Sequence, residues 1–441
     1  MDTAGRTQSA HLRVGVIKPS LFGEQTADAL PPLLFAILKA LTPPDIELIF
    51  VDENIEPVPD MACDLVALSI DSFTARRGYQ LADRFRDAGR LVVIGGMHAS
   101  FRPDEAARHA DCVVVGEAED TWGRLLADLR QGRLEPRYTS ENATDLAQVE
   151  YDYSVLGDRR YQPIGIVQFS RGCRFACDFC SVHSFFGSRL RRRPVAAVTQ
   201  SIGQLSQKLL FFSDDNLMGD PDSTEELLAA LRPLRRRWVC QISIDAASDP
   251  GLLRRMRQSG CVMVIMGFES LAAENLRQMR KSANLAADYE VAIENIKAAG
   301  LMLYGTFVIG YDYDRAETAL ELADYARRHG FAIANFNPLI ATPGTVLYDR
   351  LEQEGRLLYE RWWDDPDYRY GDTVFQPLGM SPQQLAESCR QARFAFYSPR
   401  GILARLRGAN LRGLFQLYVY LLANLVSAAS IRQKQGRRLG T

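Results

Sequence analysis

The chain has 441 residues, enough for about three average domains or for one small and one large domain. Hydrophobic residues make up 47% and charged residues 24%, which suits a folded globular protein and excludes a disordered chain, a collagen or a mini-protein. The 52 basic and 54 acidic residues leave a net charge of −2, so the chain has no overall attraction for nucleic acid.

The first third of the chain alternates short apolar runs with amphipathic segments. Runs rich in Val, Ile and Leu, bounded by turn residues, predict buried strands at 14–18, 46–52, 65–70, 91–95 and 112–116. Helical patterns separate or follow them at 31–41, 74–88, 104–109 and 119–130. This alternation implies a parallel sheet with helices on both faces. We therefore predict an α/β domain at 1–135 with a doubly wound, flavodoxin-like (Rossmann-type) sheet.

A second alternating region follows a break in the pattern. Residues 136–162 are polar and tyrosine-rich, and we interpret them as a linker. Strands are then predicted at 164–169, 209–213, 239–244, 262–267, 303–309 and 332–335, with helices notably at 224–235, 250–258, 286–299 and 315–328. An eight-stranded barrel usually needs more chain than 163–342, so we expect a partial (β/α)6 barrel. Residues 343–441 are mainly helical in pattern and form a predicted C-terminal domain.

Three of the eight cysteines, Cys173, Cys177 and Cys180, lie directly after a predicted strand with the spacing C-x3-C-x2-C. The N-terminus lacks the basic start and apolar run of a secretory signal, so we expect a reducing cytoplasm, where clustered cysteines bind metals or take part in catalysis. Three thiolates on one loop can hold three corners of an iron–sulfur cluster or a zinc ion, with one metal position left open. A zinc knuckle with His183 as fourth ligand is the alternative. The remaining cysteines are interpreted as core residues: Cys63, Cys112, Cys240, Cys261 and Cys389.

The cysteine segment, with Phe179 just before the third cysteine, resembles the cluster-binding motif of radical S-adenosylmethionine (radical SAM) enzymes. Its position after the first strand of a strand–helix array is also similar to that superfamily. The resemblance implies that the three cysteines bind a [4Fe–4S] cluster whose fourth iron binds SAM. It also implies cleavage of SAM to a 5′-deoxyadenosyl radical, and a partner such as flavodoxin or ferredoxin that donates the electron.

Polar or glycine-containing segments follow the other predicted barrel strands, at the end where such barrels carry their active sites. A helix cap explains any one of them, but five at one rim beside the cysteines favour a binding site. The resemblance assigns SAM binding to Phe179, Asp214, Asp215, Ser243, Glu269, Gly305 and Gly310. The carboxylates would accept hydrogen bonds from the amino group or the ribose, and the glycines would let the backbone approach adenine.

The N-terminal domain resembles the cobalamin-binding domain of the B12-dependent branch of the same superfamily. The residues that this resemblance assigns to cobalamin follow parallel strands and are Ser69, Asp71, Ser72, Gly95, Gly96, Met97, His98, Gly116 and Glu117. Small residues there would let a corrin edge approach the backbone. None of the five histidines follows an Asp by two positions, so the resemblance does not extend to the histidine cobalt ligand of many other cobalamin proteins. The alternatives are a cobalamin-free domain packed on the barrel and a hydrogen-bonded loop role for His98.

The C-terminal region, around 342–345 and the aromatic segment 362–371, resembles the tail of a bacterial branch that includes hopanoid methylases and bacteriochlorophyll ring methylases. In that branch it would close over the barrel mouth. Residues 414–431 form an apolar segment with flanking arginines that is marginal for spanning a bilayer. We favour a terminal helix docked on the protein, and a peripheral contact with the inner membrane is the alternative. The basic run 189–193 is interpreted as a solvated surface, with contact to an anionic substrate as the alternative.

The leading hypothesis is a cobalamin-dependent radical SAM C-methyltransferase. It would act on an unactivated carbon of a small molecule, such as a lipid, a tetrapyrrole or another secondary metabolite. The second hypothesis is a radical SAM enzyme that cyclises, couples or rearranges its substrate without methyl transfer. A non-enzymatic zinc or iron–sulfur binding protein is the third. No nucleic-acid partner is expected, and no catalytic residue is assigned beyond the cluster and SAM.

Overall fold

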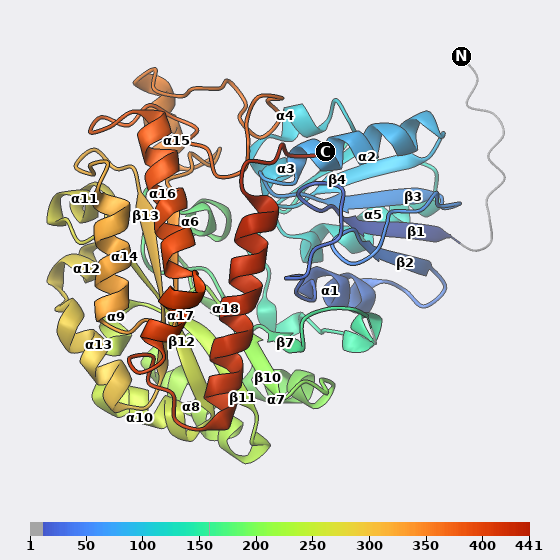
Figure 1. Cartoon of the computed structure of the whole chain (residues 1–441). Coiled ribbons are helices and arrows are strands. Elements are labelled where there is room, and N and C mark those ends of the chain that lie inside the picture. The colour runs from blue at the N-terminus through green and yellow to red at the C-terminus, as the bar shows by residue number, and fades with distance from the viewer. Residues whose placement is uncertain (1–11, 158) are drawn as a thin grey trace. The chain divides into compact units, whose positions relative to one another are not determined.

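The computed structural model describes residues 12–157 and 159–441, and it contains two six-stranded parallel sheets with helices packed on them (Figure 1). The chain divides into two compact units. The first unit ends at Arg160 and also includes Leu439–Thr441, and the second runs from Tyr161 to Arg438. The division lies within the predicted linker 136–162, whereas a separate C-terminal domain from residue 343 remains a prediction.

The sheet of the first unit has the strand order β2-β1-β3-β4-β5-β6. Its strands are β1 (Arg13–Lys18), β2 (Glu47–Asp52), β3 (Leu65–Ser69), β4 (Leu91–Gly95), β5 (Cys112–Val115) and β6 (Arg137–Thr139). The first five confirm the predicted strands, in the order of a doubly wound sheet. The sequence does not predict β6, because three residues in a polar segment carry no pattern. Burial of Tyr138, whose hydroxyl donates to Asp128 at 2.9 Å, holds it in place.

Helices cover both faces of this sheet, as the alternation predicts (Figure 1). They are α1 (Leu33–Leu41), α2 (Ala75–Asp87), α3 (Met97–Phe101), α4 (Pro103–Ala106) and α5 (Ala118–Arg130), followed by 3-10 turns at Leu146–Gln148 and Tyr153–Leu156. α1 and α5 pack on each other, and the indole of Trp122 donates to the hydroxyl of Thr42, just beyond α1, at 2.9 Å. α2 packs against β3 and β4.

The strands of the second sheet follow chain order, β7-β10-β11-β12-β13-β14, and every neighbouring pair is parallel. They are β7 (Ile164–Val167), β10 (Leu209–Phe212), β11 (Arg237–Ile242), β12 (Cys261–Glu269), β13 (Met302–Ile309) and β14 (Ile333–Pro338), and they confirm the six predicted strands. A small antiparallel ribbon, β8 (Ser170–Arg171) with β9 (Arg191–Arg192), follows β7. Because all six long strands are parallel, their carboxyl ends meet along one rim.

The helices of the second unit lie between these strands and after them. They are α6 (Ser181–Phe186), α7 (Val195–Gly203), α8 (Pro221–Leu231), α9 (Ile244–Ala247), α10 (Pro250–Gln258), α11 (Ala273–Gln278), α12 (Ser282–Ala286), α13 (Tyr289–Ala298), α14 (Thr318–Arg328), α15 (Val346–Gln353), α16 (Pro382–Phe396), α17 (Pro399–Arg405) and α18 (Leu414–Lys434), with a 3-10 turn at Arg232–Leu234. Asp220, Asp249 and Asp288 cap α8, α10 and α13 by accepting backbone N–H groups. The chain beyond residue 343 is mainly helical, as predicted.

The two faces of the second sheet differ in character. Phe268, Phe307 and Phe331 pack together with ring centroids 5.0 to 6.2 Å apart. Tyr304 and Thr306 of β13 point to the opposite face and are half-buried, because side chains alternate across a strand. One face is therefore an aromatic core, and the other stays accessible.

Candidate active site

The cysteine loop follows β7 and β8 at the carboxyl rim of the second sheet. Cys177 is buried, and Cys173 and Cys180 are half-buried. Burial raises the pKa of all three thiols, that of Cys177 to about 12. The charge of a neighbouring cysteine thiolate further raises the pKa of Cys173 and of Cys177. Such thiols become thiolates when a metal centre supplies compensating positive charge.

The cysteine loop can hold three corners of an iron–sulfur cluster. Among residues 12–157 and 159–441, no three His, Cys, Asp or Glu side chains are grouped as ligands of one metal ion. A cluster makes a different demand, because each cysteine binds its own iron. Three cysteines on one loop, with the fourth corner open, fit a [4Fe–4S] cluster.

Asp178 lies between the second and third cysteine and ties the loop to three other segments. Its carboxylate accepts the hydroxyl of Tyr311, just after β13, at 2.5 Å. Its backbone N–H donates to the carbonyl of Met279 at 3.3 Å, and its carbonyl accepts the N–H of Leu347 in α15 at 2.9 Å. Burial raises the pKa of Asp178, although the Tyr311 hydroxyl acts against that rise. These contacts hold the loop in one conformation, and no sequence motif predicts them.

Charged groups around Asp312 extend the set of contacts that holds the cysteine loop. The Asp312 carboxylate lies 3.2 Å from the Arg350 guanidinium and 2.9 Å from that of Arg356, and Arg350 also lies 4.0 Å from Asp178. The amide of Gln278 donates to Asp312 at 2.9 Å. Burial alone would raise the pKa of Asp312, but Arg356, Gln278 and Arg350 together outweigh burial and lower that pKa. The network links the cysteine loop, the turn after β13 and α15.

Asp214 and Asp215 lie just beyond β10 but have different surroundings. The Asp214 carboxylate is enclosed and accepts the N–H of Phe169 at 3.1 Å and the hydroxyl of Ser170 at 2.6 Å. Burial raises its pKa to about 7 in spite of these bonds. Asp214 therefore holds the start of the cysteine loop. Asp215 is half-buried, and burial raises its pKa to about 6. Its negative charge raises the pKa of the Cys173 and Cys180 thiols.

Glu269, at the end of β12, forms an ion pair with Lys281 at 3.1 Å. Its φ is +61°, uncommon for a residue with a side chain, and its carboxylate occupies space that a Cβ on Gly267 would enter at 2.1 Å. Burial alone would lower the pKa of Lys281, but Glu269, Cys177 and Tyr289 together outweigh burial and raise that pKa. The Lys281 charge lowers the pKa of all three cysteine thiols, so its ammonium group lies beside the loop. Sequence reasoning missed Lys281, because a lysine between two short helices carries no pattern.

Phe179 and Ser243 lie at the same rim. The Phe179 ring packs edge-on against Tyr311 with centroids 6.5 Å apart, and it is half-buried. The Ser243 hydroxyl accepts the amide of Asn216 at 3.0 Å. Both side chains are partly exposed, so they remain available to a ligand.

The two predicted adenine-site glycines have structural surroundings of their own. A Cβ on Gly305 would lie 2.3 Å from the Phe331 ring, so Gly305 packs on the aromatic face of the sheet. Gly310 has a φ of +125° and donates its N–H to Asp314 at 2.8 Å. The structure thus brings the cysteines, Asp215, Ser243 and Glu269 to one rim, and it places Gly305 on the face behind them.

The accessible face of the second sheet carries polar side chains that sequence reasoning did not assign. They are Gln241, Tyr304, Thr306, Asn335 and Asn337. The amide of Asn335 donates to the Tyr304 hydroxyl at 2.7 Å, and Thr306 is in register with Asn335. The alternation of polar and apolar residues at 334–338 is the signal that could have found this face.

In the first unit, the three predicted cobalamin segments meet at the carboxyl edge of the sheet. The N–H of Ile70 donates to the carbonyl of Gly95 at 3.0 Å, and the N–H of Gly116 donates to the Ser100 hydroxyl at 2.9 Å. Gly96 has a φ of +97°, and a Cβ there would lie 2.5 Å from the carbonyl oxygen of Ile70, so only glycine fits. The half-buried residues along this edge are Ser69, Gly95, Gly96, Met97 and Gly116.

The polar side chains of these segments bond mainly within the unit. His98 is fully buried, with Nδ1 3.0 Å from the Ser72 hydroxyl and Nε2 3.4 Å from the Glu105 carboxylate. The carboxylates of Asp71 and Glu117 accept backbone N–H groups at 2.9 and 3.1 Å. The surroundings of His98 favour its alternative role as a hydrogen-bonded loop residue.

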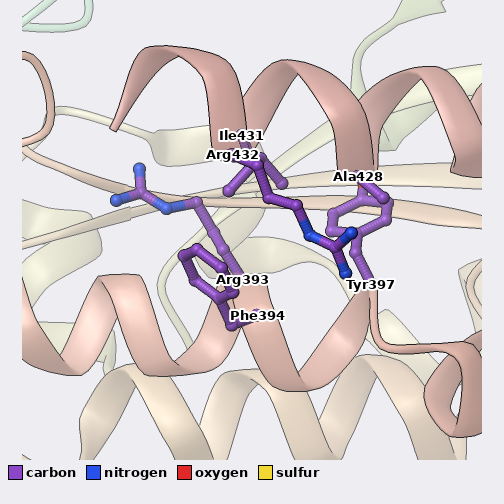
Figure 2. Close-up of a pocket in the computed structure, with 6 residues that line it drawn as sticks. All are labelled: Arg393, Phe394, Tyr397, Ala428, Ile431 and Arg432. Atoms are coloured by element: carbon purple, nitrogen blue, oxygen red, sulfur yellow. The ribbon is translucent and has the colours of Figure 1, made fainter. Parts of the chain in front are cut away.

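A separate shallow surface pocket lies between α16 and α18 (Figure 2). It is lined by Arg393, Phe394, Tyr397, Ala428, Ile431 and Arg432. Figure 2 shows that the guanidinium groups of Arg393 and Arg432 extend away from each other. Arg393 instead donates to the side chain of Gln435 at 2.6 Å. Because the two cations do not converge, we assign no ligand to this pocket.

Comparison with known families identifies two regions of the chain. Residues 167–326 match the model of the Radical SAM superfamily. Residues 345–412 match a domain of unknown function (DUF4070).

Characterised proteins and a solved structure are similar over most of the chain. A bacteriochlorophyllide d C-8(2)-methyltransferase from Chlorobaculum tepidum is 30% identical over 351 residues, which are 75% of this chain and 78% of that protein. A hopanoid C-2 methylase from Rhodopseudomonas palustris is 25% identical over 399 residues, 87% of this chain and 74% of that protein. The structure of OxsB, a cobalamin-dependent S-adenosylmethionine radical enzyme with aqua-cobalamin and S-adenosylmethionine bound, superposes with a TM-score of 0.68 at 12% identity. It covers 95% of this chain and 72% of OxsB, and it shows a shared fold.

Proposed function

We infer the function of this chain from its family: it belongs to the radical SAM superfamily, alongside the bacteriochlorophyllide and hopanoid methylases. We propose that it is a cobalamin-dependent C-methyltransferase that acts on an unactivated carbon of a tetrapyrrole, a lipid or another small molecule. The cysteine loop at the rim of the second sheet carries the proposal. A first unit with a doubly wound sheet and small residues along its carboxyl edge supports it.

Membership of the superfamily implies a [4Fe–4S] cluster and SAM, which together supply a 5′-deoxyadenosyl radical, and cobalamin would supply the methyl group. Cys173, Cys177 and Cys180 would hold three of the irons. Asp178, bonded to Tyr311, would keep the loop fixed while SAM binds and leaves. The protein's contribution is to hold the reacting groups around one carbon and to keep water from them.

The predicted SAM-binding residues take two roles in this proposal. Those with side chains at the rim would contact SAM directly: Phe179, Asp215, Ser243 and Glu269. The others would shape the site through the backbone that they hold or pack against: Asp214, Gly305 and Gly310. Their hydrogen bonds and close contacts support this division.

Cobalamin would lie along the carboxyl edge of the first sheet. The half-buried small residues there would let the corrin approach the backbone, and Asp71, Ser72, His98 and Glu117 would hold that edge in shape. We propose a cobalamin-binding domain at 1–135, a partial radical SAM barrel at 163–342 and a capping domain at 343–441. The fold shared with OxsB supports this layout.

Anaerobic reconstitution tests the proposal. The purified protein, loaded with iron, sulfide and cobalamin, should show iron–sulfur absorption and retain the corrin. Given SAM, a reductant and an extract from a strain that lacks the gene, it should form both 5′-deoxyadenosine and S-adenosylhomocysteine and add one methyl group to a metabolite. Cys177→Ala is the control and should form neither product. Failure to bind cobalamin would refute the methyl transfer, and 5′-deoxyadenosine without S-adenosylhomocysteine would favour cyclisation, coupling or rearrangement.

A further inference from the structure

The helix α18 docks on the second unit through its polar side chains. The amide of Gln416 donates to the carbonyls of Val262 and Gly300 at 3.2 and 3.1 Å. The amide of Asn424 donates to the carbonyl of Ala332 at 3.1 Å. Both side chains are almost fully buried. The two amides that interrupt the apolar segment in the sequence therefore face inward, together with Val419 and Tyr420.

The outer face of α18 is apolar. Leu414, Tyr418, Leu421 and Leu425 follow one another at intervals of three or four residues and so form one row along the helix. Their side chains are 85%, 54%, 39% and 62% exposed. A helix on the surface of a soluble domain normally turns such a row toward the core. The sequence predicts a docked helix, and the helix is docked, but with this apolar row facing outward.

The charged residues before and after this row in the chain are all of one sign. Residues 388–441 contain ten Arg and Lys and no Asp or Glu, in a chain whose net charge is −2. Arg412 precedes the row and Arg432 follows it, and both are exposed. Lys434, Arg437 and Arg438 come directly after. An apolar row with cations at each end matches an anionic lipid surface, with leucines among acyl chains and guanidinium groups at the phosphates.

We propose that the outer face of α18 binds the surface of a membrane that contains anionic lipids. Within the described residues, α18 is the one helix long and apolar enough to cross a bilayer. The inward hydrogen bonds of Gln416 and Asn424 attach it to the sheet and turns of the second unit, so it lies on the membrane and does not span it. This proposal does not depend on the proposed reaction.

A second copy of the chain is a poorer occupant of this face. A twofold contact through α18 would bring the same basic segment of each copy together, and like charges repel. The lipid surface offers charge of the opposite sign along its whole extent.

Co-sedimentation with vesicles tests the proposal on the full-length, reconstituted protein. The wild type should bind phosphatidylcholine vesicles that contain phosphatidylglycerol, more weakly without phosphatidylglycerol and more weakly at high salt. The combined substitution Leu414→Gln, Leu421→Gln and Leu425→Gln should reduce the binding constant at least about tenfold. Leu378→Gln, at a position that is 65% exposed elsewhere in the second unit, is the matched control and should bind like the wild type.

Two results would overturn the proposal. One is equal sedimentation of the triple variant and the wild type. The other is a wild-type dimer in light scattering that the triple variant dissociates, since that would assign the face to a second copy. The iron content and circular dichroism of each variant should match the wild type, because all three leucines are exposed and leave the core unchanged.

Discussion

Replacement of Lys281 by methionine removes an ammonium group that lies 3.1 Å from the Glu269 carboxylate. The two side chains are only 19% and 9% exposed, so solvent screens the pair weakly. At an effective dielectric constant of about 20, their attraction is about 5 kcal/mol. Loss of one partner leaves the other charge buried alone, which typically costs about 3 to 5 kcal/mol. We expect Lys281→Met to destabilise the second unit by an amount in that range.

A double-mutant cycle isolates the contribution of the pair. Glu269→Gln alone should also destabilise the unit, whereas the double variant should be less destabilised than the sum of the two, with a coupling energy of at least about 2 kcal/mol. Urea unfolding of cluster-free protein, followed by tryptophan fluorescence, measures this. Trp238, Trp362 and Trp363 lie in the second unit, so the signal reports mainly on it. Additive single variants, with a coupling below about 0.5 kcal/mol, would refute the reasoning.

The same substitution should change the reduction potential of the reconstituted cluster. A buried cation beside the cysteine loop stabilises the more negative, reduced state. Lys281→Met should therefore lower the equilibrium constant for reduction about tenfold, or about 59 mV for one electron. A redox titration followed by electron paramagnetic resonance measures this shift. Lys297→Met, in α13, is the matched control and should leave the reduction potential of the cluster as it is in the wild type. If Lys281→Met also has the wild-type potential, the Lys281 ammonium group does not act on the cluster.

Three further predictions follow from single contacts. Gly96→Ala should destabilise the first unit by about 2 to 4 kcal/mol, because the new Cβ would meet a backbone carbonyl at a positive φ, and thermal unfolding of that unit should show the loss. Tyr311→Phe should lower the free energy of unfolding by about 1 to 3 kcal/mol, because it leaves the Asp178 carboxylate buried without that donor. It should also speed the loss of iron from the reconstituted protein to a chelator. Tyr313→Phe, at an exposed position, is the control and should show neither effect. Folding raises the pKa of Asp214 to about 7, so between about pH 4 and pH 7 the folded state keeps a proton that the unfolded state loses. The free energy of unfolding should therefore fall as the pH rises through that window, by up to about 4 kcal/mol. Asp214→Asn should remove this fall, and unfolding measured at a series of pH values tests it.

Much of the fold could be predicted because its determinants are local. Most of the strands are short apolar runs between turn residues, and such a run is a signal carried by one local segment. The cysteine loop could be predicted for the same reason, since one short segment carries all three thiols and their spacing. β6 could not, because its three residues depend on a neighbouring strand for their hydrogen bonds.

The partners that surround the cysteine loop depend on the tertiary structure. Tyr311 and Asp178 are 133 residues apart in the chain, and their contact exists only because β13 ends beside the loop. Lys281 can be assigned to the site only from its ion pair with Glu269, a residue whose backbone has a positive φ at the end of β12. Gly305 matches a glycine expected near adenine, yet the alternation of side chains along β13 places it behind that face.

The orientation of α18 shows most clearly what the sequence predicts and what depends on the tertiary structure. The amino-acid sequence alone predicts an apolar helix with basic flanks at 414–431. The sequence does not predict which side faces inward. An amide side chain forms hydrogen bonds of similar strength with water and with a buried carbonyl that needs a donor. The tertiary structure supplies those carbonyls to Gln416 and Asn424, and so the leucines face outward.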